Sequence, residues 1–220
     1  MDGTLVETEE LWGEAMHARA AQLGGALSAA ARERTAGTTM HASMLIVYAD
    51  LGLDPATQDA DADARWVEDE AAALMTSRGM PWRPGARELL GTVRAAGLRT
   101  ALVTTTPRRV ATLVLDRITA DLGADPFDVT ICGDEAGARK PDPAPYLKAM
   151  ADLGVDPSSS LVVEDSLVGT TSGLAAGAAV LGVPLVQQLQ PQPGLTLRTT
   201  LAGLTAADLA ALLDGPAPTA

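Results

Sequence analysis

The pattern of apolar residues changes partway along the chain, and the first part is helical throughout. Apolar side chains recur at helical spacing over residues 8–23, which predicts an amphipathic helix. Residues 28–78 are rich in alanine and continue the helical pattern, with breaks at Gly37 and at the Leu-Asp-Pro stretch that starts at residue 53. Because no run in this part alternates as a strand would, we expect an all-helical subdomain.

Beyond residue 81, short apolar runs alternate with longer amphipathic stretches. We predict strands over residues 100–104, 129–132, 161–163 and 179–181, and helices over 86–96, 143–153, 206–213 and a stretch ending near Gly177. A further helix should begin with Thr106 as its N-cap and Pro107 as its first residue. The alternation predicts an α/β fold with a Rossmann-like, doubly wound parallel sheet that carries helices on both faces.

The charge of the chain narrows the choice of partners. Its net charge of -12 argues against nucleic acid and against anionic membranes. A single cysteine, Cys132, rules out an internal disulfide and favours a reducing compartment, so we expect a cytoplasmic protein. No apolar run reaches the ~18 residues of a membrane span. We expect a monomer or a weak homodimer.

Polar residues follow the predicted strands at the sheet edge where ligands bind in such folds. They are Thr104, Thr105, Lys140, Glu164 and Asp165, with Asp2-Gly3-Thr4 ahead of the helical part. Hydroxyl and N–H groups bind phosphate oxygens, and lysine is a common phosphate partner. Adjacent carboxylates suit Mg²⁺. Each feature alone also fits a plain turn, cap or solvated charge, but the combination indicates an anionic substrate held with a divalent cation.

Four stretches of the chain resemble the haloacid dehalogenase-like hydrolases. They read MDGTLVETEELW, GLRTALVTTTPRR, ARKPDPAPYL and LVVEDSLVG. The similarity is to the phosphatase and β-phosphoglucomutase-like branch, whose helical cap is inserted after the first motif, and it extends from Met1 to about Val183. The resemblance implies an α/β core of residues 1–7 and 81–220, and a helical cap of residues 8–80.

The resemblance also implies roles for the polar residues. The phosphoryl group of a small phosphorylated metabolite would pass to an aspartate, and water would then hydrolyse the aspartyl-phosphate. Asp2 would be the general acid and base of these two steps. Thr104 and Lys140 would be catalytic, and the residues that bind the phosphoryl group would be Gly3, Thr104, Thr105 and Lys140.

The same resemblance implies Mg²⁺ as the cofactor. Glu164 and Asp165 would hold the ion directly or through water, and Asp2 would contribute its backbone carbonyl. The reaction would be a Mg²⁺-dependent hydrolysis of a phosphoric monoester. Sugar phosphates, phosphoglycolate and nucleoside monophosphates are all compatible substrates at this stage.

The start of the chain raises a separate expectation. In the resembling family the nucleophilic aspartate lies two residues before the aspartate of Asp-Gly-Thr, which here is the position immediately before Met1. We therefore expect that the nucleophile and the first core strand that carries it are missing from the 220-residue chain, and that the chain is inactive without them.

Two other functions stay open. One is a phosphomutase, in which a cap arginine grips a second phosphate; the matching position is Met40, which cannot pair with phosphate, although Arg34 lies nearby. The other is a non-catalytic, truncated homologue. Dehalogenation is disfavoured, because halide departure needs no acid such as Asp2.

Overall fold

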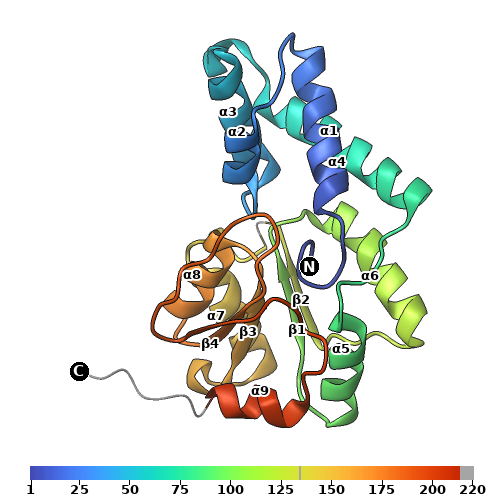
Figure 1. Cartoon of the computed structure of the whole chain (residues 1–220), viewed down its shortest axis with the longest axis vertical. Helices are drawn as coiled ribbons and strands as arrows, with labels where there is room; N and C mark the ends of the chain where they lie inside the picture. Colours follow the sequence, from blue (N-terminus) through green and yellow to red (C-terminus); the bar gives the residue numbers. More distant parts are fainter. Residues whose placement is uncertain (134, 214–220) are drawn as a thin grey trace.

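Four helices make up the first part of the chain and pack on one another. The computed structural model describes residues 1–133 and 135–213, and Figure 1 shows these helices grouped above the rest. They are α1 (Glu9–Gln22), α2 (Ala29–Thr35), α3 (Met40–Leu51) and α4 (Ala60–Arg78), with a 3-10 turn at Pro55–Thr57. Helix α4 lies against both α1 and α3. The predicted all-helical character of this part is confirmed.

Local sequence signals set the ends of these helices. Ser28, Thr39 and Asp59 are N-caps, and each side chain accepts a hydrogen bond from the backbone N–H three residues later. Gly52 ends α3 in the left-handed conformation, with φ of 69°. Tyr48 and Val67 are fully buried in the shared core, so tertiary packing adds to the local signals.

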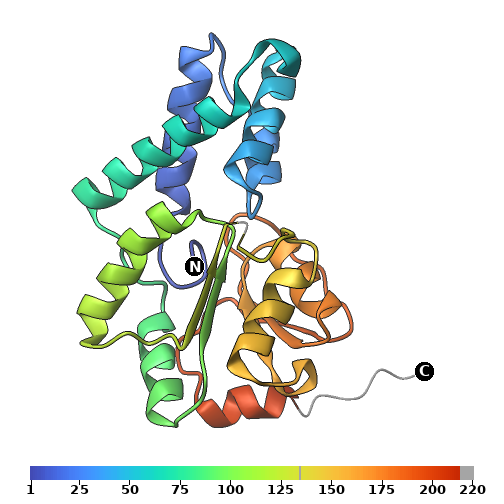
Figure 2. The same ribbon diagram turned by 180° about the vertical axis from the view of Figure 1, so that it is seen from behind.

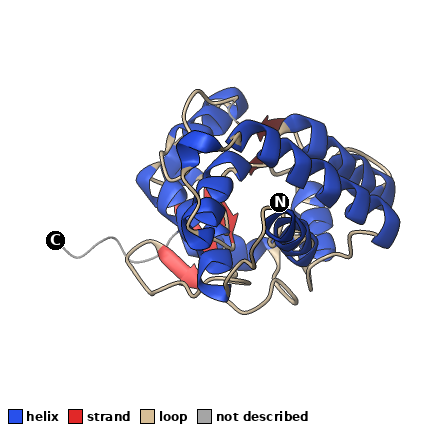
Figure 3. Ribbon diagram, turned by 90° about the horizontal axis from the view of Figure 1, so that it is seen from above, coloured by secondary structure: helices blue, strands red, loops and turns tan. Residues whose placement is uncertain are grey.

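The second part is an α/β body built from alternating helices and strands. Its elements are α5 (Ala86–Ala95), β1 (Ala101–Thr104), α6 (Arg108–Leu122), β2 (Val129–Cys132), α7 (Ala144–Leu153), a 3-10 turn (Pro157–Ser159), β3 (Leu161–Glu164), α8 (Leu167–Ala175), β4 (Ala179–Gly182), β5 (Leu195–Leu197) and α9 (Ala206–Leu213). Seen from above, helices flank the strands, and a strand lies at the periphery beside a loop (Figure 3). The α/β fold class is confirmed. Within the described ranges, no helix is long and apolar enough to cross a membrane.

The strands pair in parallel, as predicted, but in two separate sheets. One sheet has the order β1-β2, and the other has the order β3-β4-β5. Ala101 lies opposite Val129 in the first sheet, and Leu161 lies opposite Ala179 in the second. Among the described residues, no strand lies between β1 and β3, so the predicted single sheet is not continuous.

Two other predictions need correction. Thr106 is not the N-cap of α6, because Pro107 occupies that position and the Thr106 hydroxyl donates to Asp2 instead, at 2.8 Å. The short strand β5 was not predicted, since its three residues follow a Pro-Gly turn and give too little pattern to recognise. A tertiary contact in the first case and shortness in the second explain the differences.

The chain enters and leaves the helical part through two segments that lie side by side. Val6 and Trp82 form an antiparallel bridge. The Glu7 N–H donates to the Pro81 carbonyl at 2.8 Å, and the Arg83 N–H donates to the Leu5 carbonyl at 2.8 Å. Figure 2 shows both crossings from behind. The division into a core of residues 1–7 and 81–220 and a cap of residues 8–80 stays a prediction.

Candidate active site

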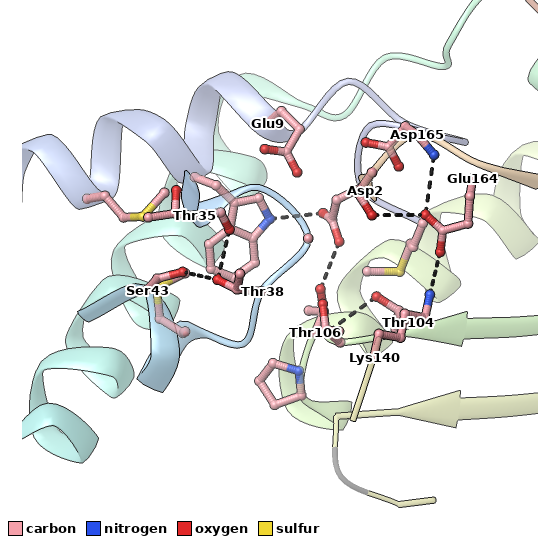
Figure 4. Close-up of a pocket in the computed structure, with 18 of the residues that line it drawn as sticks. Asp2, Glu9, Thr35, Thr38, Ser43, Thr104, Thr106, Lys140, Glu164 and Asp165 are labelled. Carbon is pink, nitrogen blue, oxygen red and sulfur yellow. Dashed lines mark hydrogen bonds and ion pairs between the residues drawn. The ribbon is translucent and has the colours of Figure 1, made fainter. Parts of the chain in front are cut away.

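A cavity of about 70 Å³ lies between the helical part and the carboxyl ends of β1 and β3. Six of the seven site residues predicted from sequence line it: Asp2, Thr104, Thr105, Lys140, Glu164 and Asp165. They converge from the N-terminal loop and from the ends of different strands (Figure 4). The structure therefore brings together residues that are up to 163 positions apart in sequence, counting from Asp2 to Asp165.

Three donors fix the Asp2 carboxylate. Its Oδ1 accepts hydrogen bonds from the Thr8 hydroxyl at 2.5 Å and from the Trp12 indole at 2.9 Å, while Oδ2 accepts from the Thr106 hydroxyl at 2.8 Å. Two donors come from the start of α1 and the third from the loop after β1. The carboxylate is thus held between the helical part and the α/β body, facing the helices.

Lys140 bridges β1 and β3 beneath the cavity. Its ammonium group donates to the Glu164 carboxylate, to the Val103 carbonyl at 3.0 Å and to the Tyr146 hydroxyl at 2.9 Å. The Tyr146 hydroxyl in turn donates to Glu164 Oε1 at 2.5 Å. Burial would raise the pKa of Glu164, but the Lys140 charge, the amino-terminal charge and the hydrogen bonds outweigh it and lower that pKa to about 2.

Asp165 lies beside the Lys140–Glu164 pair and, among the described residues, forms no ion pair with a lysine. Its Oδ1 accepts a hydrogen bond from the Thr4 hydroxyl at 2.6 Å. Burial and the neighbouring charge of Glu164 raise the pKa of Asp165 to about 7. Gly3 does not line the cavity, but it lies so close that a Cβ there would be 2.3 Å from Asp165 Oδ2.

Glu164 and Asp165 have the character of a cation site. Two adjacent carboxylates are almost fully buried, and one of them is short of positive charge, which a divalent cation with oxygen ligands would supply. The Asp2 carboxylate faces α1 instead, so any role of Asp2 toward a metal falls to its backbone carbonyl. In the part of the chain that the structure describes, no three His, Cys, Asp or Glu side chains are grouped to hold a metal.

The threonines after β1 form a compact turn at the cavity wall. Thr104 is buried, and its hydroxyl accepts a hydrogen bond from the Thr106 N–H at 3.2 Å. Thr105, between them, is half-buried and also faces the cavity. Hydroxyl and N–H donors in such a turn suit the oxygens of a bound anion.

The helical part adds residues that sequence reasoning missed. Glu9, Trp12 and Arg32 line the cavity together with Met40, whereas Arg34 is exposed and does not reach it. Arg32 donates to both the Glu9 carboxylate and the Glu9 carbonyl, each at 2.8 Å. Burial raises the pKa of Glu9 despite this partner. Trp12 and Glu9 are one helical turn apart, a spacing that could have indicated their shared face.

Comparison with known proteins identifies the family. The profile of the haloacid dehalogenase-like hydrolases matches residues 1–177. A phosphorylated carbohydrates phosphatase of Thermotoga maritima is 30% identical over 177 residues, which is 80% of this chain and 79% of the relative. Protein CbbY of Rhodobacter capsulatus is 39% identical over 101 residues, which is 46% of this chain and only 44% of that relative.

Solved structures that are similar to this chain include a CbbY protein and a β-phosphoglucomutase. The structure of CbbY from Rhodobacter sphaeroides in complex with phosphate matches with a TM-score of 0.81 at 28% identity, covering 95% of this chain and 96% of that one. A β-phosphoglucomutase from Clostridium difficile shares the fold, with a TM-score of 0.81 at 17% identity. With the four sequence stretches gathered at one cavity, the chain belongs to the haloacid dehalogenase-like hydrolases, in the branch that contains phosphatases and phosphomutases.

Proposed function

We propose that this protein is a Mg²⁺-dependent phosphatase of a small phosphorylated metabolite, with a cytoplasmic location. The observation that carries the proposal is the single cavity that joins Asp2, Thr104 and Lys140 with the buried carboxylates Glu164 and Asp165. It combines anion-binding groups, a fixed acid and base, and a cation site within one small space. The phosphatase and CbbY relatives support this reading.

In the proposed reaction, an aspartate immediately before Met1 attacks phosphorus, and the bond to the leaving-group oxygen breaks. Asp2 gives that oxygen a proton; it then takes one from the water that attacks the aspartyl-phosphate and releases inorganic phosphate. Lys140 and the turn at Thr104 offset the charge on the phosphoryl oxygens. Mg²⁺ bound by Glu164 and Asp165 would add positive charge at the same place.

The nucleophile belongs to this proposal because of where Met1 lies. Met1 is 9% exposed and lines the cavity beside Asp2, so a residue joined to its amino group would also border the site. The 220-residue chain should then bind its ligands but fail to turn them over. A chain that is complete for catalysis would release phosphate, so turnover distinguishes it from the chain that we propose.

The cavity wall supports a substrate with one phosphate. Met40 offers an adaptable apolar surface rather than a charge. Arg32, which also lines the wall, is already paired with Glu9. A phosphomutase would need a cation for its second phosphate, so hydrolysis is the better-supported function. A kcat/KM for a bisphosphate well above that for the matching monophosphate would reverse this preference.

The test is a phosphorylated-metabolite screen on a chain extended before Met1 by an apolar strand ending in aspartate. Phosphate release should need Mg²⁺, and Asp2→Asn should lower kcat at least ~100-fold, the usual share of acid–base catalysis. Asp116→Asn, which changes an exposed aspartate on α6, is the matched control and should leave kcat unchanged. No phosphate release from a cooperatively folded, extended chain would contradict the proposal.

The cation site can be tested in the 220-residue chain itself. Asp165→Asn removes a charge with little change in volume, so calorimetric titration should show at least ~10-fold weaker Mg²⁺ binding, equivalent to the loss of one good charged contact. Asp152→Asn is the control, since Asp152 is exposed and pairs with Lys148 at the surface. Equal Mg²⁺ affinity in both variants would mean that the ion binds elsewhere.

A further inference from the structure

An ion pair between Glu9 and Arg32 lies in the wall that the helical part contributes to the candidate active-site cavity. The Arg32 guanidinium donates to the Glu9 carboxylate and the Glu9 carbonyl, each at 2.8 Å, and to the Thr35 hydroxyl at 3.1 Å. Both side chains of the pair are only 14% exposed. A Cβ at Gly13 would lie 3.0 Å from Arg32 Nε, so the glycine leaves room for the guanidinium against α1. The pair is therefore a fixed part of the cavity wall.

The rest of this helical wall is uncharged. Among the described residues that the helical part brings to the cavity, Glu9 and Arg32 are the only charged ones. Thr38 and Ser43 offer hydroxyls, which are 2.8 Å apart, and Met40 offers an apolar surface. Figure 4 shows these hydroxyls on the helical side of the cavity, away from the strand ends.

The two sides of the cavity would hold different parts of a substrate. In the proposed reaction the phosphoryl group lies against Lys140 and the turn at Thr104, at the strand ends. Asp2 would give its proton to the leaving-group oxygen, and its carboxylate faces α1. The leaving group therefore extends toward the helical part, where Glu9 and Arg32 lie.

The ion pair limits the charge that this leaving group can carry. Because the charge of Arg32 is already balanced by Glu9, an anionic leaving group would lose its water without gaining a free cation from the helical wall. It would also be repelled by the Glu9 carboxylate, and repulsion of this kind is a common source of specificity. A neutral, hydroxylated leaving group meets neither cost, and it can form hydrogen bonds with Thr38 and Ser43.

We propose that Glu9 is a specificity-determining residue, and that its pairing with Arg32 restricts the substrate to phosphomonoesters whose leaving alcohol is uncharged. This inference rests on the proposed function and narrows it. Sugar phosphates and nucleoside monophosphates stay compatible, whereas phosphoglycolate, which has a carboxylate in its leaving group, is excluded. Removal of the Glu9 charge should make Arg32 available to anions, because a guanidinium forms paired hydrogen bonds with a carboxylate.

The experiment compares phosphoglycolate with its amide, phosphoglycolamide, which has the same shape but a neutral leaving group. Their dissociation constants are measured by calorimetry on the 220-residue chain with Mg²⁺ present; if the chain turns them over, kcat/KM takes the place of the dissociation constant. The unchanged chain should prefer the amide at least ~10-fold. Glu9→Gln should reduce this preference at least ~10-fold, the effect of one hydrogen bond to a charged group.

Two further variants show whether the change comes from Arg32. Arg32→Gln added to Glu9→Gln should restore the preference for the amide, because no cation is then available for the carboxylate. Glu14→Gln is the matched control, since Glu14 lies on the same helix and also pairs with an arginine, Arg78, but is exposed. This control should keep the preference of the unchanged chain.

The outcomes separate this inference from the proposed function. Equal affinity for the acid and the amide in the unchanged chain, or the same preference in Glu9→Gln and Glu14→Gln, would overturn the role of Glu9 and leave the proposed function intact. The first comparison needs no variant, so it decides the question even if Glu9→Gln does not fold. Inorganic phosphate is titrated in parallel: if it does not bind with Mg²⁺ present, the proposed function is contradicted, and the inference that rests on it falls as well.

Discussion

Gly3→Ala tests how tightly the N-terminal loop packs against Asp165, a residue of the proposed cation site. Gly3 has φ of 67°, in the left-handed region that favours glycine, and an added Cβ would lie 2.3 Å from Asp165 Oδ2 and 2.9 Å from its Cγ. Neither distance is tolerable, so the loop or the Asp165 side chain must move. Either movement disturbs the hydrogen bond from the Thr4 hydroxyl to Asp165, which is 2.6 Å long.

The loss of stability caused by Gly3→Ala has two contributions that can be measured separately. The left-handed conformation costs an alanine about 1–2 kcal/mol. Loss of the hydrogen bond to the buried carboxylate adds about 1.5–3 kcal/mol. Gly52→Ala carries the first part alone, because Gly52 has φ of 69° and a Cβ there would meet nothing within 4 Å. We therefore expect the free energy of unfolding to fall by about 2.5–5 kcal/mol for Gly3→Ala and about 1–2 kcal/mol for Gly52→Ala.

Urea unfolding of the two variants and the unchanged chain measures these losses, and Mg²⁺ titration gives an independent signal. Gly3→Ala should weaken Mg²⁺ binding because Asp165 is displaced, whereas Gly52→Ala should not. If both variants lose the same stability and keep the same Mg²⁺ affinity, the inference that the loop packs closely on Asp165 is wrong. The reasoning would also fail if Gly52→Ala were the more damaging change.

Three further changes test other contacts. Trp12→Phe removes the indole donor to Asp2 and should cost about 1–2 kcal/mol in urea unfolding, while an unchanged midpoint would show that the contact contributes nothing. Tyr146→Phe removes one buried donor to Glu164 Oε1 and should cost about 1.5–3 kcal/mol by the same measurement; a cost near zero would contradict the network. Burial raises the pKa of Glu68 even though Arg109 partly offsets the shift, so the carboxyl stabilises the fold most when it is protonated. The stability of the unchanged chain relative to Glu68→Gln should therefore decline as pH rises above 4.5 through the folded pKa, and thermal midpoints that differ by a constant amount would refute this.

The sequence predicted the parts of the site that depend on strand ends. Thr104, Lys140, Glu164 and Asp165 follow apolar runs, and the parallel fold brings such positions to one edge without further information. Thr106 was misread because a local rule for helix caps competes with a contact to Asp2, 104 positions away.

Other features depended on contacts that no local pattern carries. Trp12 and Tyr146 look like members of apolar helix faces, and only the packed structure shows that the indole N–H and the phenol reach Asp2 and Glu164. The separation of the sheets is of the same kind. Strand patterns predict that β1 and β3 exist, but whether they pair depends on what lies between them.

The paired crossings at Val6 and Trp82 give the helical part a single point of insertion. Residues that face each other across an antiparallel bridge have Cα atoms only about 4.5–5.5 Å apart, a gap that a tight two-residue turn can close. The helices can therefore be exchanged, enlarged or excised there while the order of elements in the α/β body stays intact. What covers the cavity can therefore differ without any change in the strands that carry Thr104 and Glu164.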